Sequence, residues 1–517
     1  MPRSSSSTER YHQADTSNSG PAILGRVSTG VDAAGSVDES QVVGTRVERF
    51  ARDRRRWYRR PVLVILAVTA LAGGLRFYHL SSPGSYVFDE TYYAKDGCLD
   101  AGFPFQRCRL ETPTEQTFTV HPPLGRWIIA GGEAAFGNRP FGWRFASAVA
   151  GTLSVMLLSI LAYRLFGSVL WAGVAGLMLA TEGLNFVQSR ISMLDILLTF
   201  FVLAAFLFVV LDREWIERRT PPPDRPEPGS EAALLAMPPD RPPSPIFRPW
   251  RVLAGIAFGA ALATKWSGGP ALVGGIVLIY GWERGRRKRF GLRRPLWEAV
   301  RDESFAVFVF LVILPIAVYL ASYARWFADN GVHFDAWFQV QKGMYEYSAH
   351  LRAPHPYASR PWTWPFLVRP VAYYYKGGNN PSTSAEILGL GNPAVFWTCL
   401  VALPYTLVMG TRRRDWRASL ILAAYASQYL QWYLAARTSF IFYMTPITPF
   451  MVLAIVYGLK DLSDVRIGER RARALAPVAG LVVLASVILF AYFFPVLTGR
   501  VLPYADWRRH MWFPRWI

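Results

Sequence analysis

Two kinds of ionisable residue stand outside the basic clusters of this chain, and together they could carry out a transfer reaction. The acids Asp89 and Glu90 are adjacent, and a third acid, Asp195, lies near the start of an apolar stretch. A carboxylate can take the proton from an attacking hydroxyl, while cations can neutralise a departing phosphate. The candidate cations and one histidine also lie near the ends of apolar stretches: His121, Arg144, Arg190, Lys265 and Arg437.

Each of these residues also has an ordinary structural role that the sequence leaves open. An Asp-Glu pair after a helix is commonly a solvated loop, and His121-Pro122-Pro123 is commonly a turn. The arginines could be anchors at a membrane interface. Asp195 is harder to explain in this way, because a carboxylate inside an apolar helix is expensive to keep without a partner or a site.

The same residues argue against two other kinds of chemistry. No Cys/His pattern has metal-ligand spacing, so the sequence predicts no protein-bound metal, although a divalent cation held loosely on a phosphate is compatible with it. No Gly-rich phosphate loop follows a strand, so a nucleotide donor has no support. A lipid-linked donor fits a chain made almost wholly of apolar stretches.

Those apolar stretches must position the candidate residues, and they indicate a polytopic membrane protein. Of the 517 residues, 52% are hydrophobic and 18% charged, and the charges fall in short clusters. A bilayer core needs roughly 17–25 apolar residues per helix, and about eleven stretches qualify. They are 61–79, 142–163, 168–186, 191–211, 250–265, 268–283, 304–322, 393–410, 418–435, 439–459 and 475–495. The break at 264–268 could instead be a wider irregular turn.

The net charge of +20 predicts an orientation in the membrane rather than nucleic-acid binding, because the basic clusters stand at the ends of apolar stretches. With residue 1 inside, nearly all the dense clusters fall on the inner side, and the candidate site residues share the outer face. The C-terminus then ends outside. We expect the clusters at 284–294 and 412–414 to meet anionic lipid headgroups.

This arrangement divides the chain into regions. Residues 1–50 are polar and predicted to be a disordered cytoplasmic tail, whereas 51–517 form the membrane domain. Within that domain, 80–141 is the first outer loop and 323–392 the second. The Pro-rich stretch 212–249 is predicted to be a cytoplasmic linker.

The outer loops are predicted to contain some structure of their own. The segments 122–137 and 335–351 are apolar or aromatic but too short to cross, so we expect helices lying at the interface. Cys98 and Cys108 share the first outer loop, where a disulfide can persist. Cys399 lies in an apolar stretch and is expected to be inert packing.

Several short motifs, in order along the chain, resemble those of the protein O-mannosyltransferases. They are FDETYYAKD (88–96), VHPPLGR (120–126), SRISMLD (189–195), KWSG (265–268), HPYAS (355–359), WTWP (362–365), RPV (369–371), LGNP (390–393) and RTSFIFYMTP (437–446). The resemblance implies an all-α fold of the GT-C glycosyltransferase type, with about eleven spans. It also implies inverting transfer of mannose from a polyprenyl (dolichyl-type) monophosphate to Ser or Thr hydroxyls.

Carried over by position, the resemblance assigns roles to the candidate residues. Asp89 matches the catalytic acid of the first outer loop, which acts as the base, and Glu90 beside it would help to hold the acceptor. Arg144 matches an essential arginine. Arg190, Asp195, Lys265 and Arg437 match motif positions, and phosphate binding by the cations is our own inference.

The second outer loop is too short for the lumenal domain that eukaryotic members insert there, so the chain resembles the bacterial, membrane-only form. The expected location is the cell membrane. The expected partners are the lipid donor, exported Ser/Thr proteins and the secretion machinery. One rival is a related lipid-phosphate-sugar transferase with a glycolipid or cell-wall polymer acceptor, but the second-loop motifs favour a protein. The other rival is a secondary transporter, which would place its polar groups near the midplane between repeats.

Overall fold

The computed structural model of the protein describes most of the chain beyond residue 59. The described residues are 60–110, 120–221, 241–377, 382–464, 466–467, 470–471 and 476–517. They belong to the larger of the two units into which the chain divides, Tyr58–Ile517. The tail predicted at 1–50 and the middle of the linker predicted at 212–249 lie outside the described residues.

Helices occupy every stretch that the sequence predicted as a span. They are Arg60–Phe77, α4 (Pro140–Phe166), α5 (Val169–Ala180), α7 (Leu194–Arg219), α9 (Pro249–Thr264), α10 (Gly269–Arg289), α11 (Pro295–Phe308), α12 (Leu314–Ala321), α15 (Pro393–Arg413), α16 (Trp416–Tyr429), α18 (Thr448–Ser463) and α19 (Ala476–Leu497). A π-helical turn, Val309–Ile313, joins α11 to α12. Because α7 continues to Arg219, the predicted linker begins later than expected.

Seven helices in the described residues are long and apolar enough to cross a membrane, counting Pro295–Ala321 and Ile441–Ser463 as one helix each. This supports a membrane protein. Among the described residues, the other helices in the expected spans are shorter, or less apolar where they end in basic clusters. The count of eleven crossings and the identity of the cytoplasmic side stay predictions.

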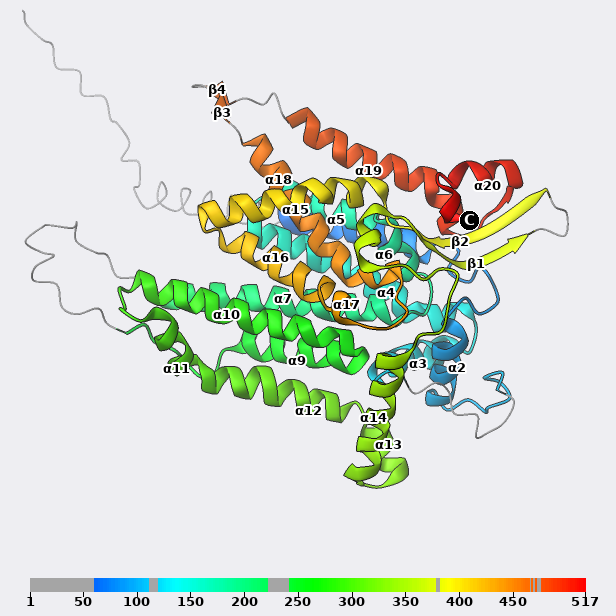
Figure 1. Ribbon diagram of the computed structural model, residues 1–517, viewed down its shortest axis with the longest axis horizontal. Coiled ribbons are helices and arrows are strands. Elements are labelled where there is room, and N and C mark those ends of the chain that lie inside the picture. The colour runs from blue at the N-terminus through cyan, green and yellow to red at the C-terminus, as the bar shows by residue number, and fades with distance from the viewer. Residues whose placement is uncertain are drawn as a thin grey trace, which may run out of the picture. The chain divides into compact units, whose positions relative to one another are not determined.

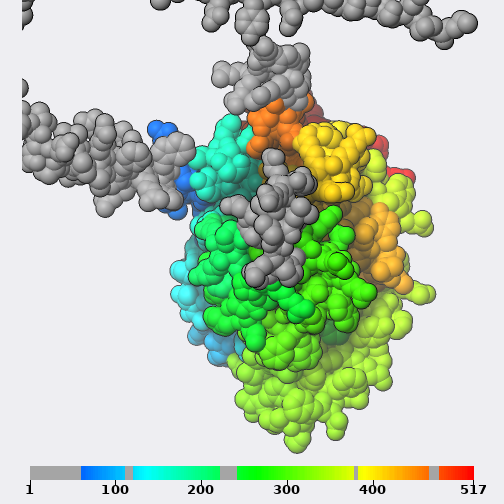
Figure 2. Space-filling view, turned by 90° about the vertical axis from the view of Figure 1, so that its left-hand side faces the viewer, coloured from blue at the N-terminus to red at the C-terminus, as the bar shows by residue number. Residues whose placement is uncertain are grey.

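The helices lie side by side, and their two ends differ (Figure 1). What we name the site end carries α2 (Glu90–Asp100), α3 (Leu124–Phe136), α13 (Ala324–Asn330) and α14 (Phe334–His350). What we name the basic end carries the C-terminal ends of α7, α10 and α15. Figure 2 looks onto the basic end, where green segments of α9 to α11 and the yellow α15 are visible.

Tight connections make neighbouring helices antiparallel. Gly167 ends α4 with φ 63°, a left-handed conformation that glycine adopts without steric cost. Ser168 then caps α5 by accepting a hydrogen bond from the Trp171 N–H. Close helix packing also depends on a small residue: a Cβ at Gly255 of α9 would lie 1.9 Å from the carbonyl oxygen of Phe310.

The shorter elements lie in the connections between these helices or after the last of them. They are α6 (Gly183–Gln188), η1 (Trp266–Gly268), η3 (Pro361–Phe366), α17 (Gln431–Leu434), η4 (Ile441–Ile447), α20 (Tyr504–His510) and η6 (Pro514–Trp516). Strands β3 (Arg466–Ile467) and β4 (Arg470–Arg471) form a small hairpin. The break expected at 264–268 is the short 3-10 turn η1, with Lys265 extended before it.

A small sheet at the site end departs from the all-α prediction. Strands β1 (Val371–Gly377), β2 (Thr383–Gly389) and β5 (Val501–Pro503) pair antiparallel in the order β1-β2-β5. The pairing of Ala385 with Val501 joins the segment 323–392, predicted to be the second outer loop, to the C-terminal segment. The indole N–H of Trp507 then donates to Glu386 at 2.6 Å, which ties α20 to β2.

The two loops confirm two further predictions. Cys98 and Cys108 form a disulfide, with Cα atoms 5.5 Å apart, and Asn138 donates to the Arg107 carbonyl at 2.7 Å just before α4. The helices expected in the loops are present as α3 and α14. Their position at a membrane interface stays a prediction. Cys399 is free and buried, as expected.

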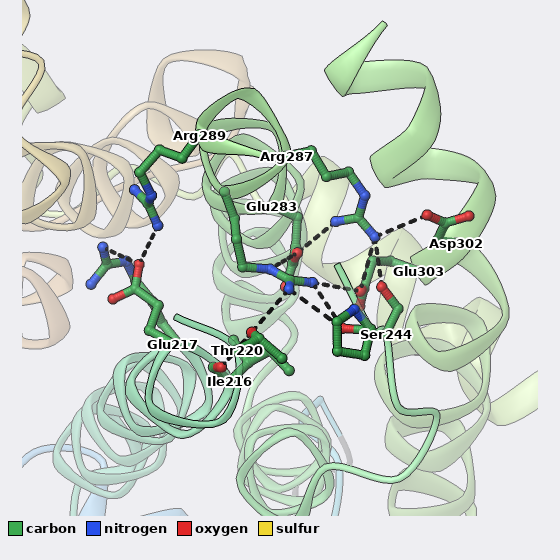
Figure 3. Close-up of polar contacts among 12 residues, drawn as sticks. Ile216, Glu217, Thr220, Ser244, Glu283, Arg287, Arg289, Asp302 and Glu303 are labelled. Atoms are coloured by element: carbon green, nitrogen blue, oxygen red, sulfur yellow. Dashed lines mark hydrogen bonds and ion pairs between the residues drawn. The ribbon is translucent and has the colours of Figure 1, made fainter. Parts of the chain in front are cut away.

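The basic end corrects one expectation. Arg286 and Arg287 do not meet lipid headgroups, because both are buried and contact Glu283 and Glu303. Figure 3 shows Arg287 between these two acids. A charge without a partner would be too costly in this position, so one acid on the same helix and one on α11 neutralise them. Arg412, by contrast, is exposed as expected.

Candidate active site

The turn before α2 directs two adjacent acids to different surroundings. Phe88 has φ 51°, which is uncommon for a residue other than glycine, and its ring packs against those of Tyr373 and Phe442. Asp89 follows as the N-cap of α2, but its side chain makes no capping hydrogen bond. Its carboxylate is therefore not used to stabilise the helix.

The charges around Asp89 come from distant parts of the chain. Burial raises the pKa of Asp89 to about 7, with Lys265 lowering it, Asp195 raising it and Arg437 lowering it. The four residues therefore share one region, as the sequence predicted. A carboxylate whose pKa lies near the working pH is well suited to accept a proton from a hydroxyl.

Asp195 and Lys265 form a buried ion pair in this region. The Lys265 Nζ lies 2.8 Å and 3.0 Å from the two Asp195 carboxylate oxygens. Lys265 can reach α7 because α9 ends at Thr264 and the backbone is extended before η1. The ammonium also lies 4.9 Å from the centre of the Tyr443 ring. Asp195 thus has the partner that its position in an apolar helix requires.

Arg437 and His121 retain polar atoms for a ligand. The one hydrogen bond described for Arg437 is a long one, 3.4 Å from Nε to the Thr438 carbonyl, which leaves most of its guanidinium donors for an added anion. Burial, with the charges of Lys265 and Arg437, holds the pKa of His121 well below its usual range. The imidazole is therefore neutral near pH 7.

These side chains line a cavity of about 610 Å³. Its charged and histidine lining residues are His121, Lys265, His350, Arg352 and Arg437, and its lining includes no acid. Apolar walls come from η1, α10 and α17 and include Trp266, Pro270 and Leu434. A cavity with several cations and no acid attracts an anionic group, and the apolar walls suit a hydrocarbon chain. We name this space the cationic cavity.

Glu90 and Arg144 differ from our expectation, because both lie in the framework. The two Glu90 oxygens accept from Arg144 at 2.7 Å and 2.8 Å and from the backbone N–H groups of Val87 and Ser192. The remaining Arg144 donors contact the carbonyls of Leu80, Pro83 and Ser85. Arg144 therefore has no guanidinium N–H left for a phosphate.

Arg190 also holds the framework. Its guanidinium contacts the carbonyls of Leu75, Arg76, Tyr78 and His79, where the helix Arg60–Phe77 ends. Those carbonyls have no partner within the helix, so a cation there satisfies them. The structure thus brings five of the predicted residues together: Asp89, His121, Asp195, Lys265 and Arg437. The other three, Glu90, Arg144 and Arg190, are used in contacts that hold the framework.

Two tyrosines of the site were missed from the sequence. Burial and the charges of Asp89 and Asp195 raise the pKa of Tyr93 well above its usual range, which places it beside the acids. Tyr443 stacks on Trp432, with ring centres 4.0 Å apart, and faces Lys265. A signal existed for Tyr93, since it lies one helical turn after Asp89. Tyr443 lies within the RTSFIFYMTP motif, but nothing there marked it over its aromatic neighbours.

The structure also bears on metal binding. Among the described residues, no group of three or more His, Cys, Asp and Glu side chains is arranged to hold a metal ion. The metal dependence of the reaction stays a prediction.

Two family models match the chain. One, described as dolichyl-phosphate-mannose-protein mannosyltransferase, matches residues 114–221. The other, described as the C-terminal four TMM region of protein-O-mannosyltransferase, matches residues 333–516.

Individual relatives agree with the family models. A polyprenol-phosphate-mannose–protein mannosyltransferase of Mycolicibacterium smegmatis is 33% identical over 488 residues, which is 87% of this chain and 92% of the relative. The Mycobacterium tuberculosis protein with this name is 32% identical over 87% of this chain and 90% of the relative. In fold, the Saccharomyces cerevisiae protein O-mannosyltransferase Pmt1-Pmt2 complex bound to the sugar donor is similar, with a TM-score of 0.68 at 15% identity over 88% of this chain and 92% of that chain. The chain therefore belongs to the protein O-mannosyltransferase family of membrane glycosyltransferases.

Proposed function

We propose that this protein transfers mannose from polyprenyl-monophosphate mannose to Ser and Thr hydroxyls of exported proteins, at the outer face of the cell membrane. One observation carries the proposal. The pKa of Asp89 is raised to about 7, and the cations close enough to act on it electrostatically, Lys265 and Arg437, line the cationic cavity. The names of the bacterial relatives support the donor and the acceptor class.

In the proposed step, the Asp89 carboxylate accepts the proton of the acceptor hydroxyl. The hydroxyl oxygen forms a bond to the anomeric carbon as the bond from that carbon to the phosphate oxygen breaks, and the phosphate leaves with the electron pair. Lys265 and Arg437 neutralise the charge that develops on the phosphate. A single displacement inverts the anomeric configuration.

We infer that the donor lies with its phosphate among the cations and its hydrocarbon chain along α10 and α17. Leu434 is 88% exposed, and Val273 and Val277 of α10 are more than half exposed. Apolar side chains this exposed on membrane helices are expected to face lipid. The prenyl chain would thus pass from the cavity into the bilayer without crossing a charged surface.

We assign Glu90, Arg144 and Arg190 as positioning residues rather than ligands of the substrate. Glu90 and Arg144 hold the loop before α2 against α4, which sets the place of Asp89. Asp195 has a related role, because its ion pair holds the Lys265 ammonium in one position.

Reconstitution tests the proposal. Purified protein in liposomes receives polyprenyl-phosphate [14C]mannose and a Ser/Thr peptide, with an Ala-substituted peptide as the control. We expect label on the Ser/Thr peptide alone, with an anomeric configuration, read by NMR, opposite to that of the donor. Label on added glycolipid or cell-wall polymer but not on peptide would favour the rival acceptor. An EDTA arm tests the loosely bound divalent cation, and co-purification from native membranes tests the secretion machinery.

A further inference from the structure

A second cavity, of about 530 Å³, shares His121 with the cationic cavity. Helix α14 contributes to both. Val340, Gly343 and Met344 line the second cavity, whereas Tyr345, Ser348 and Ala349 line the cationic one. At 100° per residue these two sets lie on different faces of the helix. Helix α14 therefore forms a wall with one cavity on each side, and His121 belongs to both.

The two cavities differ in charge. The charged residues that line the second cavity are two acids and two bases, Asp100, Arg126, Arg325 and Asp329. They are also paired, since Arg126 lies 3.2 Å from Asp96 and 3.7 Å from Asp100, and Arg325 lies 3.5 Å from Asp329. A balanced lining gives no net attraction to a phosphate, so the anionic donor belongs in the cationic cavity.

The lining of the second cavity suits a polypeptide. Trp127, Tyr323 and Trp326 offer aromatic surface, and the paired charges offer donors and acceptors for backbone amides. Arg325 and Asp329 are more than half exposed, so this part of the cavity opens to solvent. His121, which is partly buried, lies at the part shared with the cationic cavity. A chain entering from solvent would thus reach the cations at His121.

We propose that the second cavity binds the acceptor polypeptide, and that its Ser or Thr hydroxyl meets the donor at His121, at the edge of α14. This rests on the proposed function for the identity of the acceptor. The disulfide stiffens one wall, because Leu99 and Asp100 line the cavity directly after Cys98. Donor and acceptor therefore approach from different faces of α14.

Tryptophan substitutions along α14 test the division. A Cβ at Gly343 would have no atom within 4 Å, so a bulky side chain there fills the second cavity without displacing the fold. Ala349→Trp narrows the cationic cavity in the same way. Lys342→Trp is the control, because Lys342 is 56% exposed and lines neither cavity.

In the transfer assay, we expect Gly343→Trp to raise the KM for peptide at least about tenfold with little change in the KM for donor. Ala349→Trp should do the reverse, and Lys342→Trp should change neither. A larger effect of Gly343→Trp on the donor than on the peptide would overturn the proposal.

A binding experiment keeps this test independent of catalysis. A Ser/Thr peptide carrying a benzophenone next to its Ser is photolysed with the wild-type protein, and crosslinks are mapped by mass spectrometry. We expect saturable crosslinks to Arg126, Trp127 or Trp326 that Gly343→Trp removes and Ala349→Trp retains. Crosslinks confined to α10 and α17, or none that saturate, would refute the acceptor site. Crosslinks at the expected residues without any mannose transfer would instead overturn the proposed function.

Discussion

At the basic end, buried acids and arginines from α7, α9, α10 and α11 contact one another. Arg248 alone lies 2.7 Å from Asp212, 2.9 Å from Glu283 and 3.5 Å from Glu303. The space among these groups is about 20 Å³, which has room for little more than one water molecule. At the site end, Lys265, Arg352 and Arg437 instead line a cavity of about 610 Å³.

The difference shows that burial of a charge does not by itself mark a functional site. Both ends bury arginines, and at both ends the contacts join different elements. At the basic end Arg248, Arg251, Arg286 and Arg287 each contact at least one buried acid, so the network fastens four helices together. At the site end the cations keep donors free beside an open cavity, and that combination is what a ligand requires.

The largest effect that would sharpen this comparison is loss of the carboxylate base. Asp89→Asn preserves shape and removes the proton acceptor, so we expect transfer to fall by roughly 10²–10⁴-fold with donor binding retained. Steady-state kinetics measure the loss of transfer, and binding of polyprenyl phosphate measures whether the donor site is retained. Near-normal turnover would return Asp89 to the role of an ordinary loop residue.

The second effect is on stability, at the basic end. Arg248→Met leaves three acids without their shared partner, and removing one member of a buried ion network costs about 3–5 kcal/mol. We expect a lower thermal midpoint in detergent, with the KM values for donor and peptide unchanged in the folded fraction. Arg412→Met, at an exposed position, is the matched control. A raised KM for donor in Arg248→Met would contradict the assignment of a purely structural role to the basic end.

The third effect compares cations at the two ends. Arg437→Ala removes charge-assisted contacts worth roughly 1.5–3 kcal/mol, so donor use should weaken by one to two powers of ten. The double variant Arg412→Ala/Arg413→Ala should leave donor kinetics alone at matched membrane abundance. Equal losses in both variants would mean that the cationic cavity is not the donor site.

The fourth effect is the pH dependence of transfer. Burial raises the pKa of Asp89 to about 7, and the base acts only when deprotonated. The rate at saturating donor and peptide should therefore rise through pH 7, falling about tenfold per pH unit well below it. A profile that is flat between pH 5 and 8, measured where the protein stays folded, would speak against Asp89 as the base.

The smallest effect concerns the disulfide at the site end. Cys98→Ser/Cys108→Ser should cost about 2–4 kcal/mol of local order. Because the bridge stiffens one wall of the second cavity, we expect a rise of a few-fold in the peptide KM and little change for the donor. Peptide mapping without reductant checks that the wild-type bridge is present, and two free thiols there would contradict the pairing.

Local pattern was sufficient for the helices and for the charged candidates, but not for the small sheet or for the two tyrosines. The apolar stretches gave the helices, because their length and composition leave few other ways to satisfy the backbone in a membrane. The acids and cations that converge at Asp89 were also identified from their positions at the ends of those stretches. The pairing of Cys98 with Cys108 could be predicted because both lie in one short loop.

Tertiary structure decided what each charged group does. Asp89 and Glu90 are adjacent acids, yet the Glu90 carboxylate accepts hydrogen bonds from Arg144 and from the backbone N–H of Ser192. Nothing in the sequence indicates that these two partners lie beside Glu90. Arg287 was expected to meet lipid, but acids on α10 and α11 neutralise it. Strand β5 pairs with β2 although more than a hundred residues separate them. A charge acts through its partners, and here each of these groups has at least one partner on another element, so the packing determines whether it supports the fold or faces a substrate.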